Sequence, residues 1–83
     1  MKFTAYFLRN KSRPDRRGIR AEWIEQVIQS PVREQVQADG RVRLWGRIEE
    51  ADGRYLRVVL LEDRETVHNA FFDRRFDGGD DES

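Results

Sequence analysis

The 83-residue sequence contains no cysteine, and this absence excludes a disulfide framework and a thiolate metal site. It has a single histidine, His68, so a zinc site is not expected either. No apolar run approaches the roughly 20 residues that cross a bilayer, and the first residues are too few and too polar for a signal peptide. We therefore expect a cytoplasmic protein with no metal, no cofactor and no membrane partner.

Charged residues are abundant, at 39% of the chain against 37% hydrophobic residues. Two Trp, two Tyr and five Phe nevertheless supply the bulky apolar groups that disordered chains lack. The length fits one small domain, which we place at residues 1–76. Residues 77–83 are acidic and have no apolar side chain to anchor them, so we expect a disordered tail there.

The 16 basic and 16 acidic residues cancel, but they are unevenly distributed. Residues 1–20 hold seven basic residues against one acidic residue, whereas residues 73–83 hold five acidic residues against two basic ones. Such asymmetry indicates a local site for an anionic partner, although a solvated surface of mixed charge is the alternative.

The most regular stretch is Arg-Val-Arg-Leu-Trp-Gly-Arg at residues 41–47, which alternates strictly between polar and apolar positions. Because successive side chains of a strand point to opposite faces, Val42 and Leu44 belong to a core face. The opposite face, which we call the basic face, carries Arg41, Arg43, Trp45 and Arg47. Three guanidinium groups around one indole are more than solubility requires.

Helical spacing of apolar residues predicts one helix at about residues 20–29, which Pro31 ends. Residues 3–8 are short, apolar and partly aromatic, which favours a strand over a helical turn. The last strand is expected at residues 66–72. The predicted fold is therefore α+β, with one main helix packed on a four-stranded antiparallel sheet and an additional N-terminal strand at its edge.

Two copies of Ala-Asp-Gly-Arg, at residues 38–41 and 51–54, are typical of hairpin turns. As three-residue loops they place Val36 opposite Val42 and Trp45 opposite Val59. The second pairing adds Arg57 to the basic face.

The position of His68 depends on the turn before the last strand. A tight turn at residues 63–64 sets His68 opposite Val59 and on the face of Trp45. A shift of one residue would send His68 to the core side and place Asn69 and Phe71 on the basic face instead.

This pattern indicates binding of RNA, because guanidinium groups offer forked donors to phosphate oxygens and an aromatic ring stacks on a base. The candidate RNA-binding residues are Arg41, Arg43, Trp45, Arg47 and Arg57, with Arg13 and Arg16 from the basic loop that precedes the helix. The alternative is a solvated sheet face on which arginine stems cover Trp45.

His68 is the side chain whose ordinary pKa permits proton transfer near neutrality. With Arg43 and Arg57 it forms a candidate catalytic group for RNA cleavage, in which one group takes the 2′-hydroxyl proton and arginine neutralises the developing charge. A histidine in a strand is also commonly a packed residue, so the sequence leaves open whether the protein is an enzyme. Asp63 and Asp73 stand in turn-like contexts that favour structural roles. Complementary charges suggest that Asp73 pairs with Arg16, or Asp15 with Arg74.

Several short segments carry a family resemblance. They are Arg13-Pro-Asp-Arg16, Ile19, Trp23, Val27-Ile28, Pro31, Asp39-Gly40-Arg41, Arg43, Trp45, Leu56-Arg57-Val58-Val59, Thr66-Val67-His68-Asn69-Ala70-Phe71 and Asp73-Arg74. With them the chain resembles a family of small uncharacterised bacterial proteins, which in turn resembles the RelE/ParE-like toxin fold. Toxins of that fold include ribosome-dependent RNA-cleaving enzymes and gyrase inhibitors. The resemblance implies a toxin-like protein that acts on RNA, with Arg43, Arg57 and His68 as the positions to test.

A second functional class is compatible with the same residues. An exposed sheet edge and a surface tryptophan are features of a noncatalytic module that binds another protein or forms a homodimer.

Overall fold

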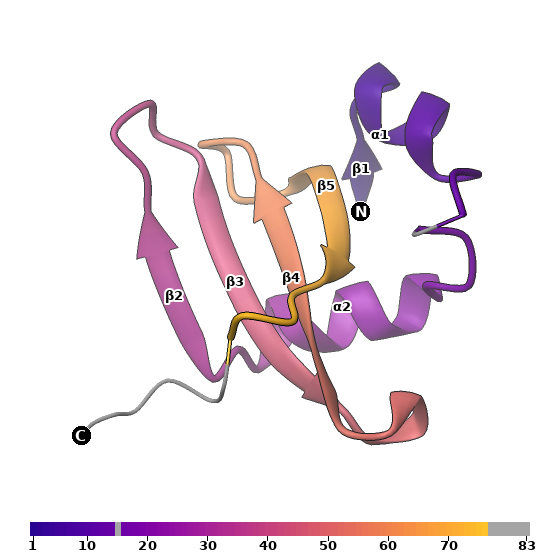
Figure 1. Cartoon of the computed structure of the whole chain (residues 1–83). Coiled ribbons are helices and arrows are strands. Elements are labelled where there is room, and N and C mark those ends of the chain that lie inside the picture. The colour runs from indigo at the N-terminus through magenta and orange to yellow at the C-terminus, as the bar shows by residue number, and fades with distance from the viewer. Residues whose placement is uncertain (15, 77–83) are drawn as a thin grey trace.

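The computed structural model describes residues 1–14 and 16–76, so the predicted acidic tail at 77–83 and Asp15, the suggested partner of Arg74, lie outside the described residues. The chain forms one five-stranded sheet with the spatial order β1-β5-β4-β3-β2 (Figure 1). The strands are β1 (Lys2–Phe3), β2 (Arg33–Val36), β3 (Val42–Ile48), β4 (Arg54–Leu60) and β5 (Thr66–Phe72). Two helices, α1 (Ala5–Asn10) and α2 (Ala21–Gln29), and a short 3-10 turn at Glu49–Ala51 complete the fold.

The predicted α+β class is confirmed, but the sheet is mixed rather than purely antiparallel. β1 runs parallel to β5, and the other neighbours are antiparallel. The four predicted strands are β2 to β5, and the short β1 is the additional N-terminal strand at one edge, with β2 at the other. The structure also has a second helix, α1, where one main helix was predicted.

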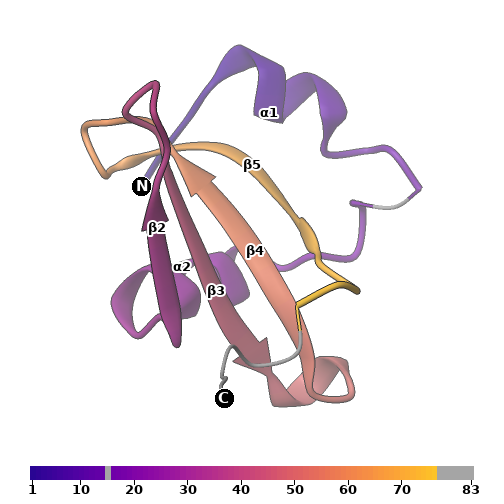
Figure 2. The ribbon, with the colours of Figure 1, turned by 60° about the vertical axis from the view of Figure 1, so that its left-hand side comes forward.

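Helix α2 lies where the apolar spacing predicted it and covers one face of the sheet. Its buried residues Trp23, Ile24 and Val27 pack against β3 and β4. Figures 1 and 2 show α2 on one side of the sheet, while the segment after β5 crosses the other side. The sheet thus has a core face under α2 and an opposite face that α2 leaves uncovered.

The prediction of a strand at residues 3–8 is largely wrong, because the strand β1 ends at Phe3 and α1 begins at Ala5. Thr4 explains the change. Its hydroxyl accepts a hydrogen bond from the backbone N–H of Phe7 at 3.0 Å, which caps the first turn of the helix. Phe3 and Phe7 then stack with ring centroids 4.9 Å apart and pack against the core.

The first hairpin has the predicted register, with Val36 opposite Val42. The second does not, because Trp45 lies opposite Arg57 rather than Val59. The connection spans residues 49–53, with a 3-10 turn whose Ala51 is buried and with Asp52 and Gly53 at positive φ. A loop longer by two residues shifts the pairing by two and preserves the face of every side chain, so Arg57 still lies on the basic face.

The predicted pairing of Val59 with His68 is also wrong. Val59 lies opposite Asn69 and Leu60 opposite Val67, so His68 is the extra residue of a β-bulge. The bulge lets Val67 and Ala70 both reach the core, where they are 0% and 1% exposed.

Candidate functional site

Arg57 is the centre of the basic face. Its guanidinium carbon lies 5.5 Å from the ring centroid of Trp45 and 5.1 Å from that of Phe71, which are its neighbours on β3 and β5. Both contacts are cation–π interactions. They hold the side chain in place, and only 21% of it is exposed. Arg57 is therefore fixed by the fold rather than free in solvent.

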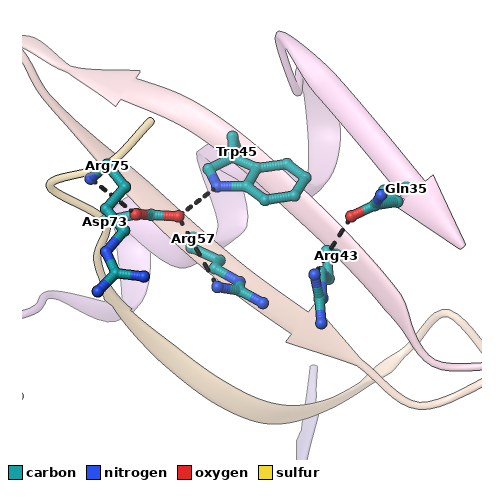
Figure 3. Close-up of polar contacts among 6 residues, drawn as sticks. All are labelled: Gln35, Arg43, Trp45, Arg57, Asp73 and Arg75. Carbon is teal, nitrogen blue, oxygen red and sulfur yellow. Dashed lines mark hydrogen bonds and ion pairs between the residues drawn. The ribbon is translucent and has the colours of Figure 1, made fainter. Parts of the chain in front are cut away.

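Asp73 connects Trp45 to Arg57 (Figure 3). The indole Nε1 of Trp45 donates a hydrogen bond to its Oδ2 at 3.0 Å, and Nη1 of Arg57 lies 3.8 Å from the same oxygen. The backbone N–H of Arg75 donates to the other oxygen at 3.0 Å. Burial raises the pKa of Asp73, but the hydrogen bonds from Trp45 and Arg75 and the charge of Arg57 outweigh it and lower the pKa. Asp73 is thus a carboxylate at neutral pH.

Trp45 itself is covered. The ring of Phe76 stacks on it with centroids 5.0 Å apart and planes at 11°, and only 6% of Trp45 is exposed. Tyr55 packs edge-on against Phe76 at 5.1 Å. The ring that the basic face presents outward beside Tyr55 is therefore that of Phe76, not the predicted Trp45.

Arg43 is the second guanidinium of the site and lies beside Arg57 on the neighbouring strand (Figure 3). Its Nη1 donates to Oε1 of Gln35 at 3.3 Å, and no carboxylate of the described residues pairs with it. Burial lowers the pKa of Arg57, the charge of Arg43 lowers it further, and Asp73 opposes both. Of the two neighbouring guanidinium groups, only Arg57 therefore has a described carboxylate beside it, that of Asp73.

The Nε atoms of Arg43 and Arg57 are buried and have no hydrogen-bond partner among residues 1–14 and 16–76. A buried donor without a partner costs about 1–3 kcal/mol of stability. This cost and the mutual repulsion of the two cations are typical of a functional site rather than of a surface optimised for stability.

Of the two candidates from the basic loop, only Arg16 reaches this site. Its Nε donates to Oδ1 of Asn69 at 3.1 Å, and its guanidinium lies 5.5 Å from the ring centroid of Phe71, which Arg57 also contacts. Arg13 instead donates to Oδ1 of Asn10 at 3.1 Å within its own segment.

The two outer arginines of the predicted face have acidic neighbours of their own. Arg41 lies 3.8 Å from the carboxylate of Asp39 in the first turn, and Arg47 pairs with Glu49 after β3. The structure thus brings Arg43, Trp45, Arg57 and Arg16 into one cluster, whereas Arg13, Arg41 and Arg47 have separate partners.

His68 is held by the N-terminal segment. Its Nδ1 lies 3.2 Å from the hydroxyl oxygen of Thr4, and its ring stacks on Tyr6 with centroids 4.8 Å apart. Burial lowers the pKa of His68, the charge of Arg41 lowers it further, and Asp39 opposes them. The imidazole is therefore neutral at neutral pH. His68 contacts Thr4 and Tyr6, whereas Arg43 and Arg57 contact Gln35, Trp45, Phe71 and Asp73, so His68 has different partners from the other two residues of the predicted catalytic group.

Asp73 and Phe76 are site residues that the sequence did not predict, and Phe71 was expected on the basic face only in the shifted register of the last strand. Asp73 was expected to pair with Arg16, but the structure pairs it with Arg57. The sequence did contain one indication of this. Asn69, Phe71 and Asp73, which directly follows the last strand, are every second residue, so in the shifted register of that strand all three lie on the basic face. Phe76 follows a turn closed by Asp73, and no sequence pattern indicates its position.

In comparisons of the chain with protein-family models, curated proteins and solved structures, nothing matched. Within residues 1–14 and 16–76, no three His, Asp or Glu side chains gather closely enough to hold a metal ion. Neither described helix is long and apolar enough to cross a membrane.

Proposed function

We propose that the basic face binds single-stranded RNA through phosphate contacts of Arg43 and Arg57. The observation that carries this proposal is the pair of neighbouring guanidinium groups of which only Arg57 has a described carboxylate partner, Asp73, on the side away from Arg43 (Figure 3). Their uncompensated charge attracts an anion, and a phosphate oxygen accepts forked hydrogen bonds from the Nη atoms.

The rings around Arg57 support the same proposal. Trp45 and Phe71 fix the guanidinium before any ligand arrives, so binding loses little side-chain entropy. Asp73 holds the Trp45 indole in position without neutralising Arg43.

Single-stranded RNA fits this face better than a duplex does. The bases of a single strand are free to stack on aromatic side chains, whereas those of a duplex are already stacked. Phe76 and Phe71 are partly exposed beside the arginines and offer such surfaces. Stacking of this kind tolerates any base, so we expect weak sequence preference.

The test is the affinity of a fluorescent single-stranded RNA for Arg43→Gln and Arg57→Gln variants, measured by anisotropy. Each variant should lose roughly ten- to a hundred-fold in affinity, because a hydrogen bond to a charged group contributes about 1.5–3 kcal/mol. Arg41→Gln and Arg47→Gln are matched controls that remove the same charge from arginines with acidic partners. Equal losses in all four variants would mean that net charge, not this pair, binds the RNA.

Cleavage by His68, Arg57 and Arg43 is tested in the same mixtures by following RNA length on a denaturing gel. Shortening that disappears in His68→Ala supports a ribonuclease. RNA that stays intact limits the proposed function to binding.

A further inference from the structure

The outer edge of β2 is open. β2 is the last strand of the sheet, all four of its residues are exposed, and no described strand pairs with its outer side (Figure 1). Along an antiparallel strand, every second residue points its N–H and C=O groups toward the neighbouring strand. Gln37 does so, because its backbone N–H donates to the carbonyl of Arg41, and Gln35 therefore also points its backbone groups toward β3. Glu34 and Val36 therefore direct their N–H and C=O groups away from the sheet.

This edge has little of the protection that usually prevents pairing between sheet edges. Edge strands are commonly blunted by proline, lysine or unpaired charge, and β2 contains neither proline nor lysine, so Arg33 is its one exposed charge besides Glu34. The charge of Glu34 is already engaged, since Arg64 from the β4–β5 turn lies 2.9 Å from its carboxylate. Two apolar side chains flank it, because Val32 is 56% exposed and Val36 is 57% exposed.

We infer that two copies of this chain pair antiparallel through β2, with Glu34 opposite Glu34 on a two-fold axis. The outward backbone groups of the two Glu34 residues then form a reciprocal pair of hydrogen bonds. In this register Val32, in the bend before β2, comes next to Val36 of the other copy, so both exposed valines are covered. The backbone N–H of Val32 already donates to the carbonyl of Trp45 at 2.7 Å, so it gives no hydrogen bond to the other copy. The two Glu34 carboxylates keep their own Arg64 partners, which removes the repulsion at the axis.

The self-complementarity of the segment selects a second copy as the occupant. When two copies of this segment pair about a two-fold axis, each contact occurs twice, as in any isologous interface. Val32 then meets Val36 twice, and Arg33 meets the uncharged Gln35 twice. No like charges face each other in this register apart from the neutralised Glu34 pair.

The dimer has a consequence for the basic face. With the axis perpendicular to the sheet, the two α2 helices lie on one side and the two basic faces on the other. The two β3 strands are then three strand spacings apart, about 14 Å. Arg33, which shares the face of Trp45 by register, lies between its own Trp45 and Gln35 of the other copy, and Arg43 of that copy is next in the same row. One anionic strand can therefore contact both copies.

The test is sedimentation of the protein without RNA over micromolar to millimolar concentrations, so its outcome does not depend on the proposed function. We expect a monomer–dimer equilibrium that Val36→Lys abolishes, because the new charge faces Val32 of the other copy. Leu8→Lys is the matched control and should leave the dimer unchanged. Leu8 is an exposed apolar residue of α1, and α1 contacts β5, which lies near the edge of the sheet opposite to β2.

Amide hydrogen exchange locates the interface. The N–H groups of Glu34 and Val36 should become protected as the protein concentration rises. A monomer at every concentration, or a dimer that survives Val36→Lys with these two amides unprotected, would overturn the inference.

Discussion

At the scale of single residues, Asp63 has the most strongly shifted carboxyl group. Its oxygens accept hydrogen bonds from the hydroxyl of Thr66 at 2.6 Å and from the backbone N–H groups of Thr66 and Glu65 at 2.9 Å. These bonds, the Thr66 hydroxyl foremost, lower the pKa of Asp63 from 3.8 to about 2. They also fix the β4–β5 turn, in which Arg64 has a φ of 61°. The structural role predicted for Asp63 fits this geometry.

The shift makes the contribution of Asp63 to stability pH-dependent. Its pKa is lower in the folded state, so the stabilisation is present above the unfolded pKa and is lost as the pH falls through the folded pKa. We expect Asp63→Ala to lower the free energy of unfolding at neutral pH. The difference in this free energy between the wild type and the variant should shrink as the pH falls from 3.8 toward 2. Urea titrations across this range measure it. A difference that stays constant down to pH 2 contradicts this role of the carboxylate.

At the scale of elements, the contact of α2 with β3 depends on Gly46. A Cβ at this position would lie 2.8 Å from Cγ2 of Val27, closer than side-chain atoms normally approach. Gly46→Ala should therefore destabilise the protein by about 1–3 kcal/mol through overpacking. The double variant Gly46→Ala/Val27→Ala should lose less than the sum of the single losses, because Val27→Ala removes the clashing methyl groups. Thermal unfolding of the four proteins checks this, and strictly additive losses would count against the close contact.

Periodic elements were predictable from sequence, and local irregularities were not. Alternation in residues 42–48 and apolar spacing in residues 21–29 each reflect burial of one face, which is why β3 and α2 occur where expected. The start of α1 instead depends on one hydroxyl, that of Thr4. The bulge at His68 depends on how Val67 and Ala70 fit the core, which only the packed structure decides.

At the scale of the whole molecule, the sheet separates stability from the proposed binding. Its core face buries the apolar residues under α2, and its other face holds arginines among aromatic rings. The site was partly predictable because the two-residue error in the second hairpin preserves side-chain faces. Arg57 was therefore still placed on the face of Trp45, although the predicted residue opposite Trp45 was Val59. Asp73 and Phe76 come from a segment that folds back over the sheet, and their positions depend on tertiary contacts with Trp45.

The central claim is that Arg43 and Arg57 together bind the phosphates of single-stranded RNA. Its most direct test is an NMR titration at low salt that follows the arginine Nε–H signals, which are assigned through single Arg→Gln variants. We predict that the signals of Arg43 and Arg57 move together with added RNA and return when salt is raised, because phosphate contacts weaken with ionic strength. The signal of Arg64, which is paired with Glu34, should stay still. If the signals of Arg43 and Arg57 stay in place while RNA binds, the claim is wrong.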